Sequence, residues 1–147
     1  DTVDTWQPAA ILSLFKYELK SNENSFTTAV QTSRDNGTTF FEQTLAISLK
    51  KQDQAMHKNI KLLAYGRPRI IVRTMTDQFF LMGLAQGCDT TAGEISSGAA
   101  LGDFNGYKLT FVASEVLPAN FIDVSSEAAL KTAFATGAGE DATIVTT

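Results

Sequence analysis

The chain has 147 residues, of which 44% are hydrophobic, and it carries a formal net charge of −4. This length and this apolar content fit one globular domain with its own core, and they argue against a disordered chain. The acidic balance argues against a protein that clamps nucleic acid with a basic face, and apolar runs of about six residues are too short to span a bilayer.

The N-terminal third is typical of β-strands. Apolar and charged side chains alternate over residues 15–20, which is the period-two pattern of a half-buried strand. Residues 26–33 form a second candidate that is rich in threonine and only weakly apolar. Asn36-Gly37 follows and predicts a β-hairpin, because both residues tolerate a positive φ. Beyond it, residues 41–49 place apolar side chains on one face of the best-defined strand.

From residue 53 the apolar period becomes that of a helix, with His57 and the lysines on the polar side. Asp53 suits the N-cap, and Gly66 ends the helix. Residues 69–74 and 78–87 then predict two strands joined near Thr76-Asp77. Their almost continuous hydrophobicity predicts burial on both faces.

The last third begins with residues 88–102, which contain few bulky side chains and are predicted to be a loop. Residues 107–113 alternate as a strand, and residues 125–137 predict a short helix with Ser125 or Ser126 as its cap and Gly137 as its stop. We therefore expect a mainly β (α+β) fold in a single domain, residues 1–147. It would be an antiparallel β-sandwich or barrel with one flanking helix and a short C-terminal helix. We expect flexible ends of about ten residues each, 1–10 and 138–147.

Residues that carry chemistry are scarce. His57 is the only histidine, and it lies on the polar side of the predicted helix. Cys88 is the only cysteine, so it forms no intrachain disulfide and fits a reducing compartment. These two residues fall short of the four Cys or His ligands of structural zinc, and no glycine-rich segment has the lysine of a phosphate-binding loop. We expect no enzyme, no cofactor and no metal site.

Two segments point instead to assembly. The threonine-rich hairpin around Asn36-Gly37 has few apolar anchors, and an isolated ribbon of this kind is marginally stable in water. A loop of about fifteen residues after Cys88 is unusual unless it is functional or ordered by a partner. The hairpin either folds back onto its own sheet or pairs with neighbouring copies, and the two segments together favour an assembly subunit.

Three features carry a family resemblance: the N-G-T-x-F-x-E-Q turn into a long strand at residue 36, the helix that runs into a strand, and the closing G-D-F-N-G-Y-x-L-T-F…P-A segment. In these features, over residues 14–122, the chain resembles small virion structural proteins from tailed phages and prophages of Bacteroidetes. The resemblance implies a tail-tube-like subunit that forms hexameric rings with a continuous inner barrel, in which a hairpin or loop contacts the next ring.

The resemblance also implies the partners and the location. Copies of the chain and other tail proteins would be the partners, and genomic DNA would pass through an acidic lumen with only non-specific contact. The protein would assemble in the host cytoplasm and reside in the virion tail, without a membrane anchor. The candidate inter-subunit contacts are Arg34, Asp35, Asn36, Gly37, Thr38, Cys88, Asp89, Thr90, Thr91, Glu94 and Asp103.

Two alternatives stay open. One is another virion component, such as a capsid-decorating, neck or tail-terminator protein. The other is a β-sandwich module that binds carbohydrate or protein through its aromatic residues, Trp6, Tyr17, Tyr65 and Tyr107. Tyr17 and Tyr107 share the apolar register of their predicted strands, which favours core packing over an exposed platform.

Overall fold

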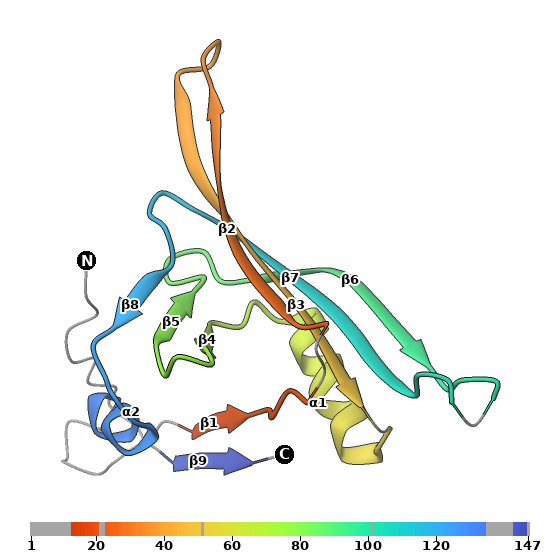
Figure 1. The fold of residues 1–147 in the computed structure, drawn as a ribbon. Helices are drawn as coiled ribbons and strands as arrows, with labels where there is room; N and C mark the ends of the chain where they lie inside the picture. The colour runs from red at the N-terminus through yellow and green to blue at the C-terminus, as the bar shows by residue number, and fades with distance from the viewer. Residues whose placement is uncertain (1–12, 21–22, 51, 101, 135–142, 147) are drawn as a thin grey trace. The chain divides into compact units, whose positions relative to one another are not determined.

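A computed structural model describes residues 13–20, 23–50, 52–100, 102–134 and 143–146 (Figure 1). These residues form nine strands and two helices, so the mainly β fold class is confirmed. They fall into two compact units, a larger one of residues 19–70 and 82–119 and a smaller one of the other described residues. Neither unit is one continuous stretch of chain, so the single domain stays a prediction.

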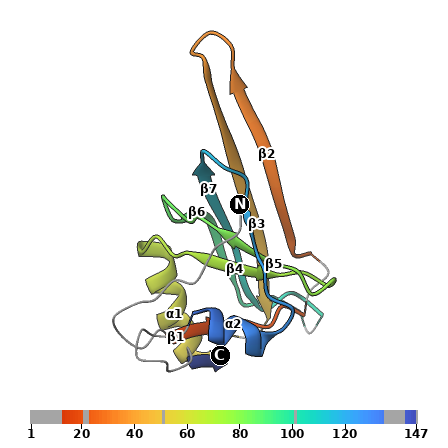
Figure 2. The ribbon, with the colours of Figure 1, turned by 90° about the vertical axis from the view of Figure 1, so that its left-hand side faces the viewer.

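The larger unit is built on a four-stranded antiparallel sheet in the order β2 (Ser25–Ser33), β3 (Thr38–Lys50), β7 (Gly106–Glu115) and β6 (Asp89–Ser96). The predicted hairpin is confirmed as β2 and β3, joined by the turn 34–37. Of its two signal residues only Gly37 takes a positive φ, 63°. Figure 2 shows that this hairpin reaches beyond the end of β7.

The sheet has two chemically different faces. Leu45 lies opposite Phe111 and Leu49 opposite Tyr107, and all four side chains are buried. We call their side the apolar face. Successive side chains in a strand alternate between faces, so Thr44, Ser48 and their neighbours form a polar face on the other side. The alternation predicted for residues 41–49 and 107–113 is therefore confirmed.

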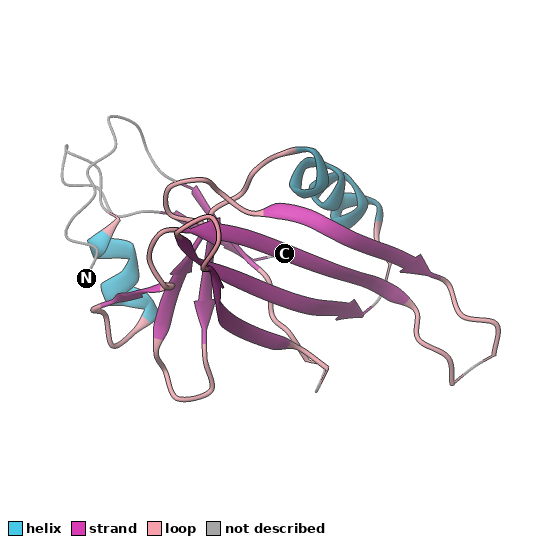
Figure 3. Ribbon diagram, turned by 90° about the horizontal axis from the view of Figure 1, so that it is seen from above, coloured by secondary structure: helices cyan, strands magenta, loops and turns pink. Residues whose placement is uncertain are grey.

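Helix α1 (Gln54–Tyr65) lies against β6, on the apolar face of the sheet (Figure 3). The Thr90 hydroxyl donates to the carbonyl of Leu63 at 3.3 Å, and Ile60 is buried. The predicted ends are confirmed, since the Asp53 carboxylate accepts from the amide of Gln54 and Gly66 is the C-cap.

The loop predicted over residues 88–102 is wrong, because residues 89–96 are strand β6, paired with β7. Threonine, alanine and glycine give this strand no apolar alternation, and six of its eight residues are exposed. Backbone hydrogen bonds to β7 stabilise it instead of side-chain burial. A register shift between Thr90 and Ala92 marks a β-bulge, and residues 97–105 connect β6 to β7.

The smaller unit contains a three-stranded sheet in the order β4 (Ile70–Arg73), β5 (Phe79–Met82) and β8 (Asn120–Ile122). One core cluster packs β5 and β8 against α2 (Glu127–Ala133); its buried members are Phe79, Leu81, Ile122, Leu130 and Phe134. The predicted C-terminal helix is confirmed with Ser126 as its cap, since the hydroxyl accepts from the amide of Ala129 at 3.2 Å.

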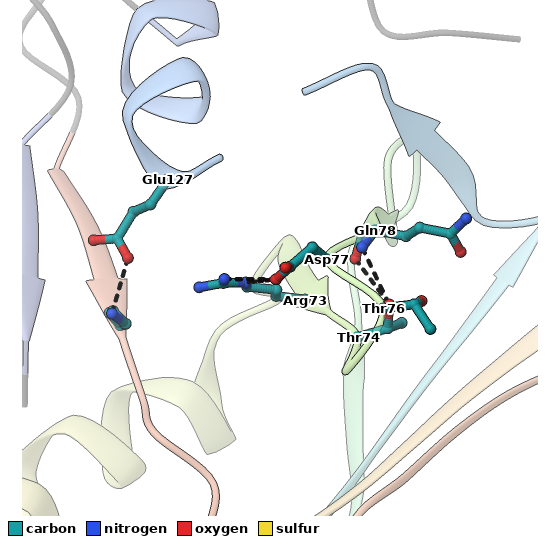
Figure 4. Close-up of polar contacts among 7 residues, drawn as sticks. Arg73, Thr74, Thr76, Asp77, Gln78 and Glu127 are labelled. Atoms are coloured by element: carbon teal, nitrogen blue, oxygen red, sulfur yellow. Dashed lines mark hydrogen bonds and ion pairs between the residues drawn. The ribbon is translucent and has the colours of Figure 1, made fainter. Parts of the chain in front are cut away.

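Polar contacts order the surface of the smaller unit (Figure 4). The predicted turn between β4 and β5 is confirmed, and in it Asp77 has a positive φ of 58° while its carboxylate accepts from Arg73 at 2.6 Å. The ammonium of Lys16 lies 2.9 Å from a carboxylate oxygen of Glu127, at the start of α2. The Arg73–Asp77 pair is exposed and the Lys16–Glu127 pair is half-buried, and ion pairs that keep this much contact with solvent contribute little to stability.

The two ends of the described chain differ from the predictions. Strand β1 covers only Ser13–Lys16 and pairs in parallel with β9 (Thr143–Thr146), which lies in the predicted flexible tail. A parallel pair between segments this far apart in sequence leaves no local signal. Residues 1–10, the helix stop Gly137 and residues 138–142 lie outside the described residues.

Candidate assembly surfaces

The end of the β2–β3 hairpin is the first candidate surface. Strand β3 pairs with β7 only from Phe41 to Lys50, so residues 38–40 pair with β2 alone. We call residues 31–40 the hairpin end. All of them except Ser33 are exposed, and the sequence-predicted contacts Arg34, Asp35, Asn36, Gly37 and Thr38 lie together there. All five are exposed, and their role as contacts between subunits stays a prediction.

The outer strands β2 and β6 are the second candidate surface. Among the described strands, neither pairs with a further strand on its outer side. Such an edge presents unpaired backbone groups and must be protected or paired. Strand β6 carries Asp89, Glu94 and a bulge, whereas β2 has no charged residue in its nine positions. β2 is therefore the less protected edge.

Each outer strand also exposes an apolar side chain. Val30 on β2 is 61% exposed and Ile95 on β6 is 54% exposed. Val30 lies opposite Phe41 and Ile95 opposite Tyr107, so both belong to the apolar face. Burial of these two side chains by a partner would stabilise a contact at either edge.

Four predicted contacts from the 88–102 segment lie on β6. Asp89 forms an ion pair with Arg67 at 3.0 Å, and the Thr91 hydroxyl donates to the carbonyl of Thr110 at 3.4 Å. Thr90 is half-buried, and Glu94 is exposed. The structure therefore divides most of the predicted contacts between the hairpin end and the outer strand β6, instead of gathering them at one place.

Cys88 is not available as a surface contact. Its side chain is fully buried, and the thiol lies 3.6 Å from the carbonyl oxygen of Met82. Burial raises the pKa of this thiol to about 12. A thiol with so high a pKa is almost entirely protonated at neutral pH, so Cys88 is unreactive in the folded chain.

Asp103 bonds to its own connector. Its carboxylate accepts from the amides of Ala99, at 2.9 Å, and Ala100, at 2.8 Å. These two bonds, the one from Ala100 first, lower the pKa of Asp103 below its ordinary value. The side chain is exposed, and both bonds lie within the connector between β6 and β7.

The pKa of Asp103 leads to a prediction on pH dependence. Because the folded pKa is lowered, the stability from these two bonds is present above the ordinary aspartate pKa and is lost as pH falls through the lowered value. We expect the NMR amide signals of Ala99 and Ala100 to titrate together with a midpoint below 3.8, the ordinary value. Asp103→Asn is the control and should abolish that titration, whereas a midpoint at or above 3.8 would contradict the assignment.

Gln43, which sequence reasoning missed, is a buried polar group on the apolar face, 2% exposed. Its side-chain oxygen accepts from the amide of Gly83 at 3.2 Å, and its nitrogen donates to the carbonyl of Leu117 at 3.3 Å. Gly83 has a φ of 71°, and a Cβ there would lie 2.6 Å from the sulfur of Cys88. Gln43 therefore fastens the tight turn 83–88 to the sheet.

Glu115, the second residue that sequence reasoning missed, fastens the same turn from β7. One of its carboxylate oxygens accepts from the amides of Ala85, at 3.1 Å, and Gln86, at 2.9 Å. It lies opposite Phe41, which is the residue nearest the hairpin turn at which β3 still pairs with β7. The turn is therefore held at the level where the hairpin leaves the rest of the sheet. A polar residue in an apolar register was the available signal for both Gln43 and Glu115.

The described residues offer little for catalysis or metal binding. His57 is exposed, and its Nδ1 lies 3.4 Å from the hydroxyl of Tyr107. In the described ranges, no three His, Cys, Asp or Glu side chains are grouped so that they would hold a metal ion. Neither described helix has the length and apolar character needed to cross a membrane.

Comparisons with protein families, with curated proteins and with solved structures found no match to this chain. Any assignment of function therefore depends on the sheet edges, the hairpin end and the sequence features described above.

Proposed function

We propose that the chain is a non-enzymatic tail-tube subunit of a tailed phage or prophage. Copies form a ring by pairing their sheet edges, and the rings stack through the hairpin end into a tube that conducts DNA. The observation that carries this proposal is the direction of the outer strands, β2 and β6.

Strand direction favours repeated edge pairing. The four strands alternate in direction, so β2 and β6 run opposite to each other. Strand β6 of one copy therefore pairs in antiparallel fashion with β2 of the next, and the alternation continues across every contact. This contact joins two different edges, so it repeats around a ring and leaves no edge unpaired at closure.

The hairpin end supports stacking. Residues 38–40 and their partners on β2 lie beyond the part of the sheet that pairs with β7, and nearly all are exposed. In a ring of joined sheets these residues project along the strands, where the next ring would lie. Their side chains are mostly threonine, serine and other short polar groups, which suit a hydrogen-bonded contact between rings.

The polar face suits a lumen through which DNA passes. In register, Glu42, Asp89 and Glu94 belong to this face together with Lys50 and Lys108. Glu23 adds a carboxylate 3.4 Å from the ammonium of Lys108, and Asp89 is paired with Arg67, so carboxylates outnumber ammonium groups on this face. Tight binding to a duplex needs a cluster of several cations that neutralise phosphates, and this face has no such cluster. We propose a mildly acidic lumen wall, in the sense that the resemblance implies.

Particle size and shape test the proposal. We expect the full-length purified chain to form rings or tubes, seen by light scattering coupled to size exclusion and by negative-stain microscopy. A discrete monomer that persists at high concentration would contradict it. Rings that never stack would contradict the tube and support the alternative of a neck or terminator protein.

The carbohydrate-binding alternative is less well supported. Tyr107 is 1% exposed, so its ring has no face for a sugar. Tyr65 on α1 is exposed, but a stacking platform needs further aromatic rings on the same surface.

A further inference from the structure

We propose a specific register for the contact between copies: Asp89–Ser96 of one copy pairs with residues 25–31 of the next, displaced by four residues along the strands, with the apolar face outward. This inference rests on the proposed function and names which residues of the second copy lie beside β6.

The two outer strands, β2 and β6, do not cover the same levels of the sheet. β2 begins at Ser25, opposite Ala46 of β3. β6 ends at Ser96, opposite Gly106, which in turn lies opposite Lys50 of β3. Lys50 is four residues beyond Ala46, so the two outer strands end at different heights.

This difference in height determines how two copies can pair. The residues of β3 can be used to mark height in the sheet. On this scale, β2 lies beside Thr38 to Ala46, and β6 lies at the height of Thr44 to Lys50. Copies at equal height would overlap only between Thr44 and Ala46. Four residues is the smallest even displacement at which β2 of the next copy covers the full height of β6. Only even displacements keep the apolar faces of both copies on one side.

The strands of a closed barrel must tilt relative to the barrel axis. Each copy contributes four strands, and at a spacing of about 4.8 Å these span about 19 Å across the sheet. A displacement of four residues, at a rise of about 3.3 Å per residue, is about 13 Å along the strands. The strands then tilt by about 35° from the barrel axis, within the usual range of about 35–45°. This angle does not depend on the number of copies. A displacement of two residues would give about 20°, outside that range.

The side chains at the contact also favour a displacement of four residues. With a displacement of four, Ile95 lies beside Phe26 of the next copy and Val30 lies beside Thr90, all on the apolar face. With a displacement of six, Ile95 would lie beside Thr28 and Val30 beside Gly93. Pairs of apolar and β-branched side chains are the more favourable cross-strand neighbours. The register of four residues therefore uses both exposed apolar side chains.

The direction of the displacement determines which face is outside. The amide of Ser48 donates to the Asn24 carboxamide oxygen at 2.8 Å, so it points toward the β2 side, while the Ser48 side chain belongs to the polar face. For L-residues, this places β2 on the left when the apolar face is viewed with β3 pointing up. The next copy lies beyond β6, on the right, and is displaced upward. The strands of the closed barrel therefore lean to the right of the barrel axis. The fixed hand of sheet twist gives closed barrels this lean when they are seen from outside. The apolar face with α1 is therefore the outer face.

Disulfide cross-linking measures this register. Glu94→Cys serves as a fixed probe, combined in the same chain with one of four substitutions on the polar face of β2: Ser25→Cys, Thr27→Cys, Ala29→Cys or Gln31→Cys. In the proposed register Glu94 faces Thr27 in a pair without mutual hydrogen bonds, where Cα atoms lie about 4.5 Å apart, within reach of a disulfide. The buried Cys88 does not compete.

We expect mild oxidation of the Thr27→Cys combination to give a ladder of covalent multimers, on the order of tenfold more than the Gln31→Cys combination gives. A maximum at Ser25→Cys or Ala29→Cys would overturn the displacement of four. Thermal melting of each variant shows that it folds, and Glu94→Cys alone is the control for contacts between like strands.

Failure of the register and failure of the proposed function are distinguishable. Rings that persist in light scattering while no pair cross-links would overturn the β6–β2 contact and leave a ring-forming subunit. Monomers that neither cross-link nor associate would overturn both. A ladder from Glu94→Cys alone would show that β6 meets β6, which also overturns the register.

Discussion

Replacing Glu115 with alanine lowers the free energy of unfolding by about 2–4 kcal/mol, in our expectation. The carboxylate is 8% exposed and accepts from the amides of Ala85 and Gln86. Alanine leaves both donors without this acceptor, and hydrogen bonds to an ionised acceptor are among the stronger ones. Urea denaturation followed by circular dichroism measures the loss.

The matched control is Glu115→Gln, which keeps an acceptor oxygen at nearly the same place and removes only the charge. We expect it to cost less than half as much as alanine. Equal losses in the two variants would show that charge, and not the pair of hydrogen bonds, is what the turn requires. A loss below about 0.5 kcal/mol in Glu115→Ala would show that the turn 83–88 does not depend on this residue.

A shortened hairpin is expected to separate ring formation from stacking. Deleting Thr32, Ser33, Thr38 and Thr39 removes two cross-strand pairs and joins the turn 34–37 to Gln31 and Phe40, which already face each other. An even number of pairs keeps every remaining side chain on its own face. We expect single rings in place of tubes, because the residues proposed to reach the next ring are gone.

Folding should survive this deletion. The removed residues pair only with one another, and each such cross-strand pair contributes about 0.2–1 kcal/mol. Negative-stain images give the length of the assemblies, and thermal melting checks the fold. The control replaces Thr32 and Thr39 with serine, which keeps the length and should keep the tubes. Tubes of unchanged length from the shortened chain would contradict a role in stacking.

Local patterns in the sequence predicted the elements whose structure and burial are determined by their own residues. Strands β3 and β7 alternate apolar and polar residues, and the structure buries the apolar side chains on one face. Helix α1 has its cap at Asp53 and its end at Gly66 as the sequence indicated. In each case the residues that decide the structure lie within a few positions of one another.

Elements stabilised by distant partners were missed. β6 has no apolar alternation, and it is a strand because β7 lies beside it. β1 and β9 come from opposite ends of the chain and pair in parallel. Single-sequence reasoning reads periodicity within a segment, and a ladder formed with a remote segment does not alter that periodicity.

The candidate surfaces were predicted in part. The hairpin end was located correctly because Asn36-Gly37 is a local turn signal, and the placement of its five residues follows from it. The burial of Cys88 could not be predicted, because it depends on the turn 83–88, and this burial argues against Cys88 as a contact between subunits. Gln43 had a visible signal, a polar side chain in an apolar register, but its partners could be named only from the structure.

The alternating strand directions have a consequence for how assemblies grow. In the proposed assembly, an incomplete arc of any size ends in one free β2 and one free β6, so each of its two unlike ends can form the same β6–β2 contact with a further copy. Neither end limits the number of copies in the arc. Growth stops only when the curvature of the arc brings the first and last copies together. A substitution that changes the rotation between neighbouring copies should therefore change the number of copies in the ring, or give open spirals where the rotation no longer closes.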